Sequence, residues 1–159
     1  MARFANVEER VESPSERRVR IFLAVMFFIQ TIVTSIPFIQ GPVVVDGEKT
    51  YVTLTMLTFL INPGHYGDIG GVPLAVVSGI LIIFPIVTFF FCVLDTKSIV
   101  KFILSGACAV VSAAIICFVF ASYISIGAVI TLVLNVICLF MTSQGIQATV
   151  FRKRQQQSP

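Results

Sequence analysis

The sequence predicts an all-α integral membrane protein, with four transmembrane helices in an up-down bundle and a short hairpin and an interfacial helix in the first outer loop. Of its 159 residues, 57% are hydrophobic and only 12% are charged, about half of the roughly 25% charged residues typical of soluble domains. No Asp, Glu, Lys or Arg lies between Lys101 and Arg152, and this run can hold two helices of roughly 20 residues each. Two more apolar stretches precede it, so we expect four spans.

The first span is predicted at residues 21–39, after a helix start at Ser13, Pro14 and Glu16. Ser13 can accept from the backbone N–H of the third helical residue, Pro14 suits the first helical position, and Glu16 can accept from the Ser13 N–H. Residues 1–20 are therefore expected to form a cytosolic tail and this helix start. Pro37 is expected to end or bend the span.

The outer loop is expected at residues 40–71. An Asp46-Gly47 turn flanked by β-branched residues predicts a short hairpin at residues 43–52. A lone hairpin is marginally stable in water and needs support from the bundle or from a partner. Residues 54–61 are apolar but too short to cross a bilayer, so they predict an interfacial helix, with a buried re-entrant segment as the alternative.

The other three spans are predicted at residues 72–94, 102–121 and 126–148, and the last two are joined by a turn at residues 122–125. Pro85 removes one backbone hydrogen bond and crowds the carbonyl of Leu81, which predicts a helix kink. Residues 21–148 form the transmembrane domain in this interpretation, and residues 149–159 form a cytosolic C-terminal tail.

The positive charges set the orientation. In the four-span arrangement, only Lys49 lies on the outer side. The other ten of the eleven basic residues lie together on the opposite side: Arg3, Arg10, Arg17, Arg18, Arg20, Lys97, Lys101, Arg152, Lys153 and Arg154. The positive-inside rule therefore puts both termini in the cytosol. The compact loops and the lack of eukaryotic sorting motifs favour a bacterial cytoplasmic membrane.

The cysteines and the histidine do not define a catalytic or metal site. The four cysteines form no C-x-x-C pair and all lie in predicted spans: Cys92, Cys108, Cys117 and Cys138. We expect them to be buried as small apolar fillers, because a disulfide-exchange enzyme needs paired thiols at the membrane surface. His65 lies near Asp68, but one imidazole with scattered carboxylates does not make a tetrahedral metal site.

The polar residues inside the predicted spans are neutral, which counts against proton-coupled transport through an intramembrane carboxylate. They are Gln30, Thr31, Thr34, Ser78, Thr88, Ser112, Thr131 and Asn135. We expect them to form hydrogen bonds that join helices. Gln30 and Asn135 share a predicted depth of roughly 15 Å on the first and last helices. A direct or water-bridged hydrogen bond is therefore predicted between these two amides.

Small residues occupy one face of the third span, namely Ser105, Ala109, Ser112 and Ala113. Such a face lets helices approach closely, and it predicts a packing seam either inside the bundle or between copies of the chain.

The predicted order of four spans, cytosolic ends and a larger first outer loop is similar to that of claudin-like and tetraspanin-like proteins. The chain has no Trp, and its predicted outer loop has no Cys. It thus lacks the residues by which those families are recognised, and the sequence assigns no family.

Two classes of function fit these observations. The first is a non-enzymatic interaction or scaffold subunit of a membrane complex, whose partners are the lipid bilayer and either another membrane protein or further copies of the chain. The alternative is a component of a small-solute or ion transporter or channel. No catalytic residue, cofactor or metal ligand is predicted, and the net charge of +3 lies beside the membrane ends, where it sets orientation and does not predict nucleic-acid binding.

Overall fold

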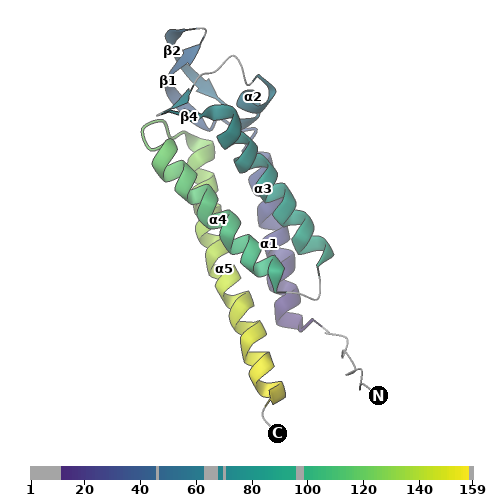
Figure 1. Cartoon of the computed structure of the whole chain (residues 1–159). Helices are drawn as coiled ribbons and strands as arrows, with labels where there is room; N and C mark the ends of the chain where they lie inside the picture. Colours follow the sequence, from purple (N-terminus) through teal and green to yellow (C-terminus); the bar gives the residue numbers. More distant parts are fainter. Residues whose placement is uncertain (1–11, 46, 63–67, 70, 96–98, 158–159) are drawn as a thin grey trace, which may run out of the picture.

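The computed structural model describes residues 12–45, 47–62, 68–69, 71–95 and 99–157 (Figure 1). This part of the chain is mostly helical. Its helices are α1 (Pro14–Val33), α2 (Met56–Ile61), α3 (Leu74–Leu94), α4 (Val100–Val119) and α5 (Ile126–Gln157). Its strands are β1 (Ile39–Val45), β2 (Glu48–Leu54), β3 (Asp68–Ile69) and β4 (Val72–Pro73).

Three helices are long and apolar enough to cross a membrane, namely α3, α4 and residues Ile126–Val150 of α5. They have 21, 20 and 25 residues, and roughly 20 residues are needed to cross the hydrocarbon core. These three helices indicate an integral membrane protein.

The helix α1 begins as predicted but ends early. The Ser13 hydroxyl accepts from the Glu16 N–H at 3.2 Å, and Oε2 of Glu16 accepts from the Ser13 N–H at 2.9 Å, which confirms the capping box. The predicted end at residue 39 is wrong, since α1 stops at Val33. Pro37 has no N–H and disfavours helix at the residue before it. The next residue, Phe38, donates its N–H to the Leu54 carbonyl at 2.8 Å.

The predicted hairpin is confirmed and is longer than expected. Antiparallel pairing of β1 with β2 runs from Ile39 opposite Leu54 to Val45 opposite Glu48. Gly47 in the turn has a φ of 85°, which a glycine adopts without steric cost. We call the end of the molecule that carries this hairpin the hairpin end, and the opposite end, where α1 begins and α5 finishes, the terminal end (Figure 1).

The hairpin is attached to the turn between α4 and α5. The Gln40 N–H donates to the Tyr123 carbonyl at 2.8 Å, and the Ser125 N–H donates to the Phe38 carbonyl at 3.2 Å. The first residue of β1 is thereby bridged to Ile124. The expected turn at residues 122–125 is therefore present, and it supplies the support that a two-stranded hairpin needs.

The short helix α2 confirms the helix predicted at residues 54–61. The hydroxyl of Thr55 accepts from the Thr58 N–H at 3.2 Å and caps its start. Met56 and Phe59 are fully buried, and α2 packs against α3. The helix thus buries one side against α3, and the apolar side chains of Leu57 and Ile61 are exposed on its other side.

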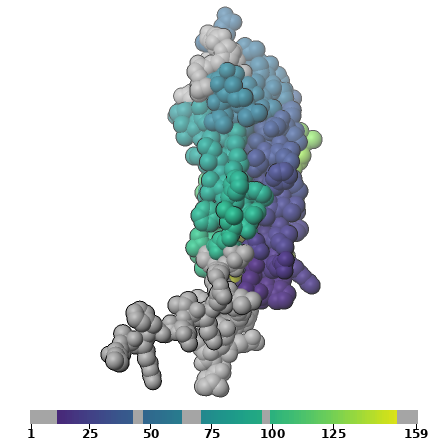
Figure 2. Space-filling view, turned by 90° about the vertical axis from the view of Figure 1, so that its right-hand side faces the viewer, coloured from purple at the N-terminus to yellow at the C-terminus, as the bar shows by residue number. Residues whose placement is uncertain are grey.

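The four long helices pack side by side, α1 between α3 and α5, and α4 against α5 and α3. Figure 2 shows α3 (teal) alongside α1 (purple to blue). The interior contains two apolar clusters. One lies under the hairpin and includes Phe38, Phe59 and Phe120, and the other includes Leu23, Phe27 and Phe102.

Candidate functional site

A cluster of charged side chains joins the helices near the terminal end. Nε of Arg20 on α1 donates to both carboxylate oxygens of Glu12, at 2.8 and 3.1 Å. Nη1 of Arg20 donates to the carbonyl oxygens of Cys92 at 2.8 Å and Val93 at 3.3 Å. The last four carbonyls of a helix have no partner within it, so Arg20 satisfies two carbonyls at the end of α3.

Lys101 on α4 completes this ionic cluster. Its Nζ donates to Oε1 of Glu12 at 3.2 Å and lies 5.3 Å from the ring centroid of Phe102. Although it is a lysine, the residue is only 1% exposed. Glu12 therefore neutralises two cations from different helices in one partly buried site.

Glu16 forms the second polar contact at this end. It is 2% exposed, and its Oε1 accepts a hydrogen bond of 2.9 Å from the hydroxyl of Thr149 on α5. The other carboxylate oxygen closes the capping box of α1. Glu16 was expected only in the capping box, and Lys101 was expected in the connection between the second and third spans. No local signal tells which charged residues will face other helices.

Most of the hydroxyls expected to join helices are satisfied within their own helix. The expectation of interhelical bonding is therefore wrong for most of this set, since donation to a carbonyl one turn earlier is available to any helical Ser or Thr. It is confirmed for Ser78 of α3, whose hydroxyl also lies 3.7 Å from Sδ of Met56 on α2 as a hydrogen-bond donor. The pairs within one helix are Thr31 to Phe27, Thr34 to Thr31, Ser78 to Leu74, Thr88 to Phe84 and Thr131 to Gly127.

A second group of buried polar atoms has no hydrogen-bond partner in the described part of the chain. It comprises both amide atoms of Gln30 and of Asn135, and the hydroxyls of Ser112 and Thr142. All four residues are at most 4% exposed. The two amides do not form the direct hydrogen bond that the sequence analysis allowed. The water-bridged alternative stays a prediction.

The predicted seam on α4 lies partly in the interior. Ser105, Ala109 and Ser112 are buried, whereas Ala113 is only half-buried. One close contact of α4 with α5 uses a glycine outside the predicted seam. A Cβ added at Gly145 would lie 2.6 Å from the ring of Phe102. Pro85 lies buried within α3, and the predicted kink there stays a prediction.

All four cysteines have free thiols, but only three are buried. Cys92, Cys108 and Cys138 face the interior as expected. Cys117 is exposed on the outer face of α4, so the expectation that it is buried is wrong. Within the described ranges, no group of three or more His, Cys, Asp and Glu residues could hold a metal ion. His65 and Asp46 lie outside the described residues.

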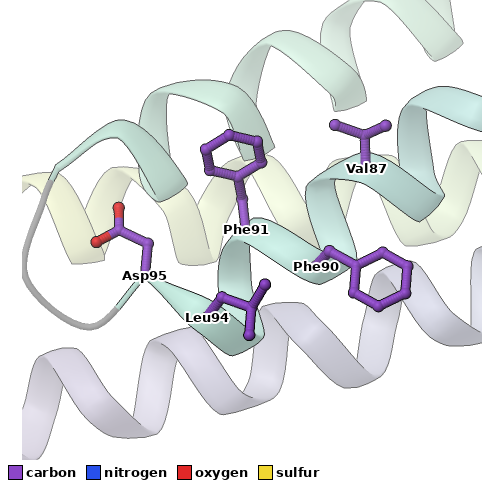
Figure 3. A pocket seen from close by; sticks show the side chains of 5 residues that line it. All are labelled: Val87, Phe90, Phe91, Leu94 and Asp95. Atoms are coloured by element: carbon purple, nitrogen blue, oxygen red, sulfur yellow. The ribbon is translucent and has the colours of Figure 1, made fainter.

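Apolar grooves lie on the outer side of α3. One groove of about 360 Å³ is lined by Val87, Phe90, Phe91 and Leu94, with Asp95 at the helix end (Figure 3). Val87 also lines a second groove, of about 450 Å³, farther toward the hairpin end. Side chains of this kind suit contact with lipid chains on a membrane-spanning helix.

Comparison of the chain with protein-family models, with curated proteins and with solved structures finds no match. The chemistry of the site therefore has to be argued from the residues alone.

Proposed function

We propose that this chain is a four-span membrane protein with both termini in the cytosol, in the cytoplasmic membrane of a bacterium. The proposal adds α1 to the three helices of membrane-spanning length. Residues 21–33 of α1 carry no charge and rise about 20 Å. Arg17 and Arg18 precede them and are exposed, and such long basic side chains can reach the headgroups from a helix end.

The function that we propose is that of a non-enzymatic interaction or scaffold subunit. The observation that carries it is the attachment of the hairpin. β1 is hydrogen-bonded to β2 on one side and to the α4–α5 turn on the other. β2 pairs in the described part of the chain only with β1, and residues Glu48 to Tyr51 are exposed.

An edge strand on a rigid support is a surface to which an extended segment of another protein can add. The hairpin would lie outside the membrane in the proposed orientation. Its position therefore favours a partner that is reached from the outer side, either another membrane protein or a second copy of the chain.

Site-specific photo-crosslinking in native membranes tests this function. A photoreactive residue at Lys49 or at Thr53 of β2 should give one discrete product with a protein partner. The same residue at Gln144, which is exposed on α5 far from the hairpin, serves as the matched control and should not give that product. A hairpin that forms no product at either position contradicts the scaffold function.

The alternative function is a component of a solute or ion transporter. It is favoured by the neutral polar side chains of Gln30, Ser112 and Asn135 in the interior. Purified protein in liposomes should then carry a solute flux that Asn135→Leu abolishes. We expect no proton-driven uptake, because proton-coupled transport normally uses an ionisable group within the membrane.

A further inference from the structure

Three of the unpartnered polar side chains, those of Gln30, Ser112 and Asn135, lie at one level along the four long helices. The level on α1 and α5 is fixed by two contacts, one in the first turn of α1 and one in the segment that follows α1. Near the hairpin end, the Gly127 N–H donates to the Pro37 carbonyl at 2.8 Å. Near the terminal end, the Thr149 hydroxyl donates to Glu16. The two helices therefore run antiparallel with a defined register.

This register places Gln30 and Asn135 at the same level. Gln30 lies fourteen residues along α1 from Glu16, and Asn135 lies fourteen residues back along α5 from Thr149. Both are then about 21 Å from that contact. Fourteen residues are close to four turns of roughly 3.6 residues, so both amides return to the faces on which α1 and α5 meet.

Ser112 reaches the same level from α4. The contact of Phe102 with Gly145 fixes α4 against α5. Ser112 lies ten residues along α4 from Phe102, and Asn135 lies ten residues back along α5 from Gly145. The thiol of Cys92 and the hydroxyl of Ser105, 3.4 Å apart, fix α3 against α4 in the same way.

Pro85 lies seven residues before Cys92 on α3, and Ser112 lies seven residues after Ser105 on α4. The contact between Cys92 and Ser105 therefore places Pro85 opposite Ser112. Pro85 has no N–H to donate to the carbonyl of Leu81. Helices α1, α4 and α5 thus each contribute a buried polar side chain to one layer, and Pro85 of α3 lies at the same level.

The burial of these groups makes the layer a site that requires a ligand. Gln30, Ser112 and Asn135 are at most 1% exposed, and five of their side-chain atoms have no partner in the described part of the chain. A buried donor or acceptor left unsatisfied costs roughly 1–3 kcal/mol. Native proteins commonly satisfy such groups with bound water.

The chemistry of the atoms selects the ligand. The site offers two amide NH₂ groups as donors, two amide oxygens as acceptors, and a hydroxyl that can do either. A buried ion would need a neutralising charge beside it. The nearest charged side chains in the described chain lie near the terminal end, about 15 to 21 Å away along the helices.

We propose that Gln30, Ser112 and Asn135 form a central binding site for a neutral molecule that both donates and accepts hydrogen bonds, which is either water or a small amide-like or hydroxyl-bearing solute. The proposal depends on the packing of the helices and not on the scaffold function. The two sources share one hydrogen-bonding chemistry and are distinguished by experiment.

Nuclear magnetic resonance of the full chain in deuterated lipid nanodiscs tests the site. With the side-chain amides of Asn and Gln labelled, magnetisation should pass to the NH₂ groups of Gln30 and Asn135 from a bound molecule. Transfer from water alone assigns bound water. Transfer from added acetamide that replaces the water signal assigns a solute site. Both results support the proposal.

Variants make the test specific. Asn135→Leu should abolish the transfer at Gln30, and Ser112→Ala, which removes a single hydroxyl, should weaken the transfer at both amides while the fold is kept. Thr131→Val is the matched control on α5, because its hydroxyl already donates to the Gly127 carbonyl at 2.9 Å. Contact between the two amides with no transfer from water or acetamide would overturn the proposal.

Discussion

The hydroxyl of Thr149 donates a hydrogen bond of 2.9 Å to Oε1 of Glu16 across 133 residues of sequence. The same hydroxyl also donates toward the Gly145 carbonyl of its own helix at 2.9 Å. Glu16 in turn caps the first turn of α1. One buried carboxylate therefore starts a helix and fixes the position of the last helix against it.

This relationship predicts an energetic coupling between the two residues. Thr149→Val should lower the free energy of unfolding by roughly 1–3 kcal/mol, because it leaves a buried carboxylate oxygen with fewer partners. Glu16→Gln keeps a capping side chain but removes the charge. The double variant should lose less than the sum of the single losses when unfolding is measured in mixed micelles. Thr131→Val should add to Glu16→Gln without coupling, since it touches a different part of α5.

The contact between Gly145 and Phe102 predicts that α5 tolerates no side chain there. Gly145→Ala should destabilise the protein by roughly 1–3 kcal/mol, because the added methyl group overlaps the buried ring of Phe102. Gly79→Ala is the matched control in α3, where the nearest atom to an added Cβ is 3.9 Å away. It should be neutral or stabilise by up to about 1 kcal/mol. Equal effects in thermal unfolding would contradict the close approach of α4 and α5.

Arg20 is predicted to matter more than the arginine one turn before it. Arg20→Met removes the donors to the Cys92 and Val93 carbonyls and leaves Lys101 as a partner of Glu12. A loss of roughly 1–3 kcal/mol is expected. Arg17→Met changes an exposed side chain, so its effect should stay within about 0.5 kcal/mol. An unfolding experiment in which both variants behave alike would count against the role of Arg20 at the end of α3.

The features that could be predicted from the sequence are those set by residues close together in the chain. The capping box of Ser13 and Glu16 and the Asp46-Gly47 hairpin each have a local signal. The turn before Ile126 was predicted because the uncharged run is too long for one span. The ionic cluster could not be predicted, because the burial of Lys101 depends on where Glu12 lies, 89 residues away. The local signal of Pro37 predicted an end or a bend of the first span, but the pairing of Phe38 and Gln40 with distant segments could not be predicted.

The proposed orientation predicts which ends of the helices face outward. In a variant without native cysteines, a cysteine at Glu48 should react with a membrane-impermeant maleimide on intact cells. A cysteine at Arg17, at the terminal end, should react only after the membrane is opened. Both positions are exposed, so a difference reports sidedness and not burial. Reaction at Arg17 from outside would contradict the four-span arrangement with cytosolic termini.

The sign of a stability change shows whether Gln30 and Asn135 are satisfied by a shared ligand. If neither amide has a partner, Gln30→Leu and Asn135→Leu should each stabilise the protein, since each removes an unsatisfied buried group. We expect the opposite. A molecule held between them makes each single substitution cost roughly 0.6 to 2 kcal/mol, and the double variant should lose less than the sum. Thr31→Val beside Gln30 is the control, because its hydroxyl already donates to the Phe27 carbonyl. Unfolding measured in detergent decides between amides without a partner and amides that share a bound molecule. A gain in stability from both single substitutions rules out the shared site.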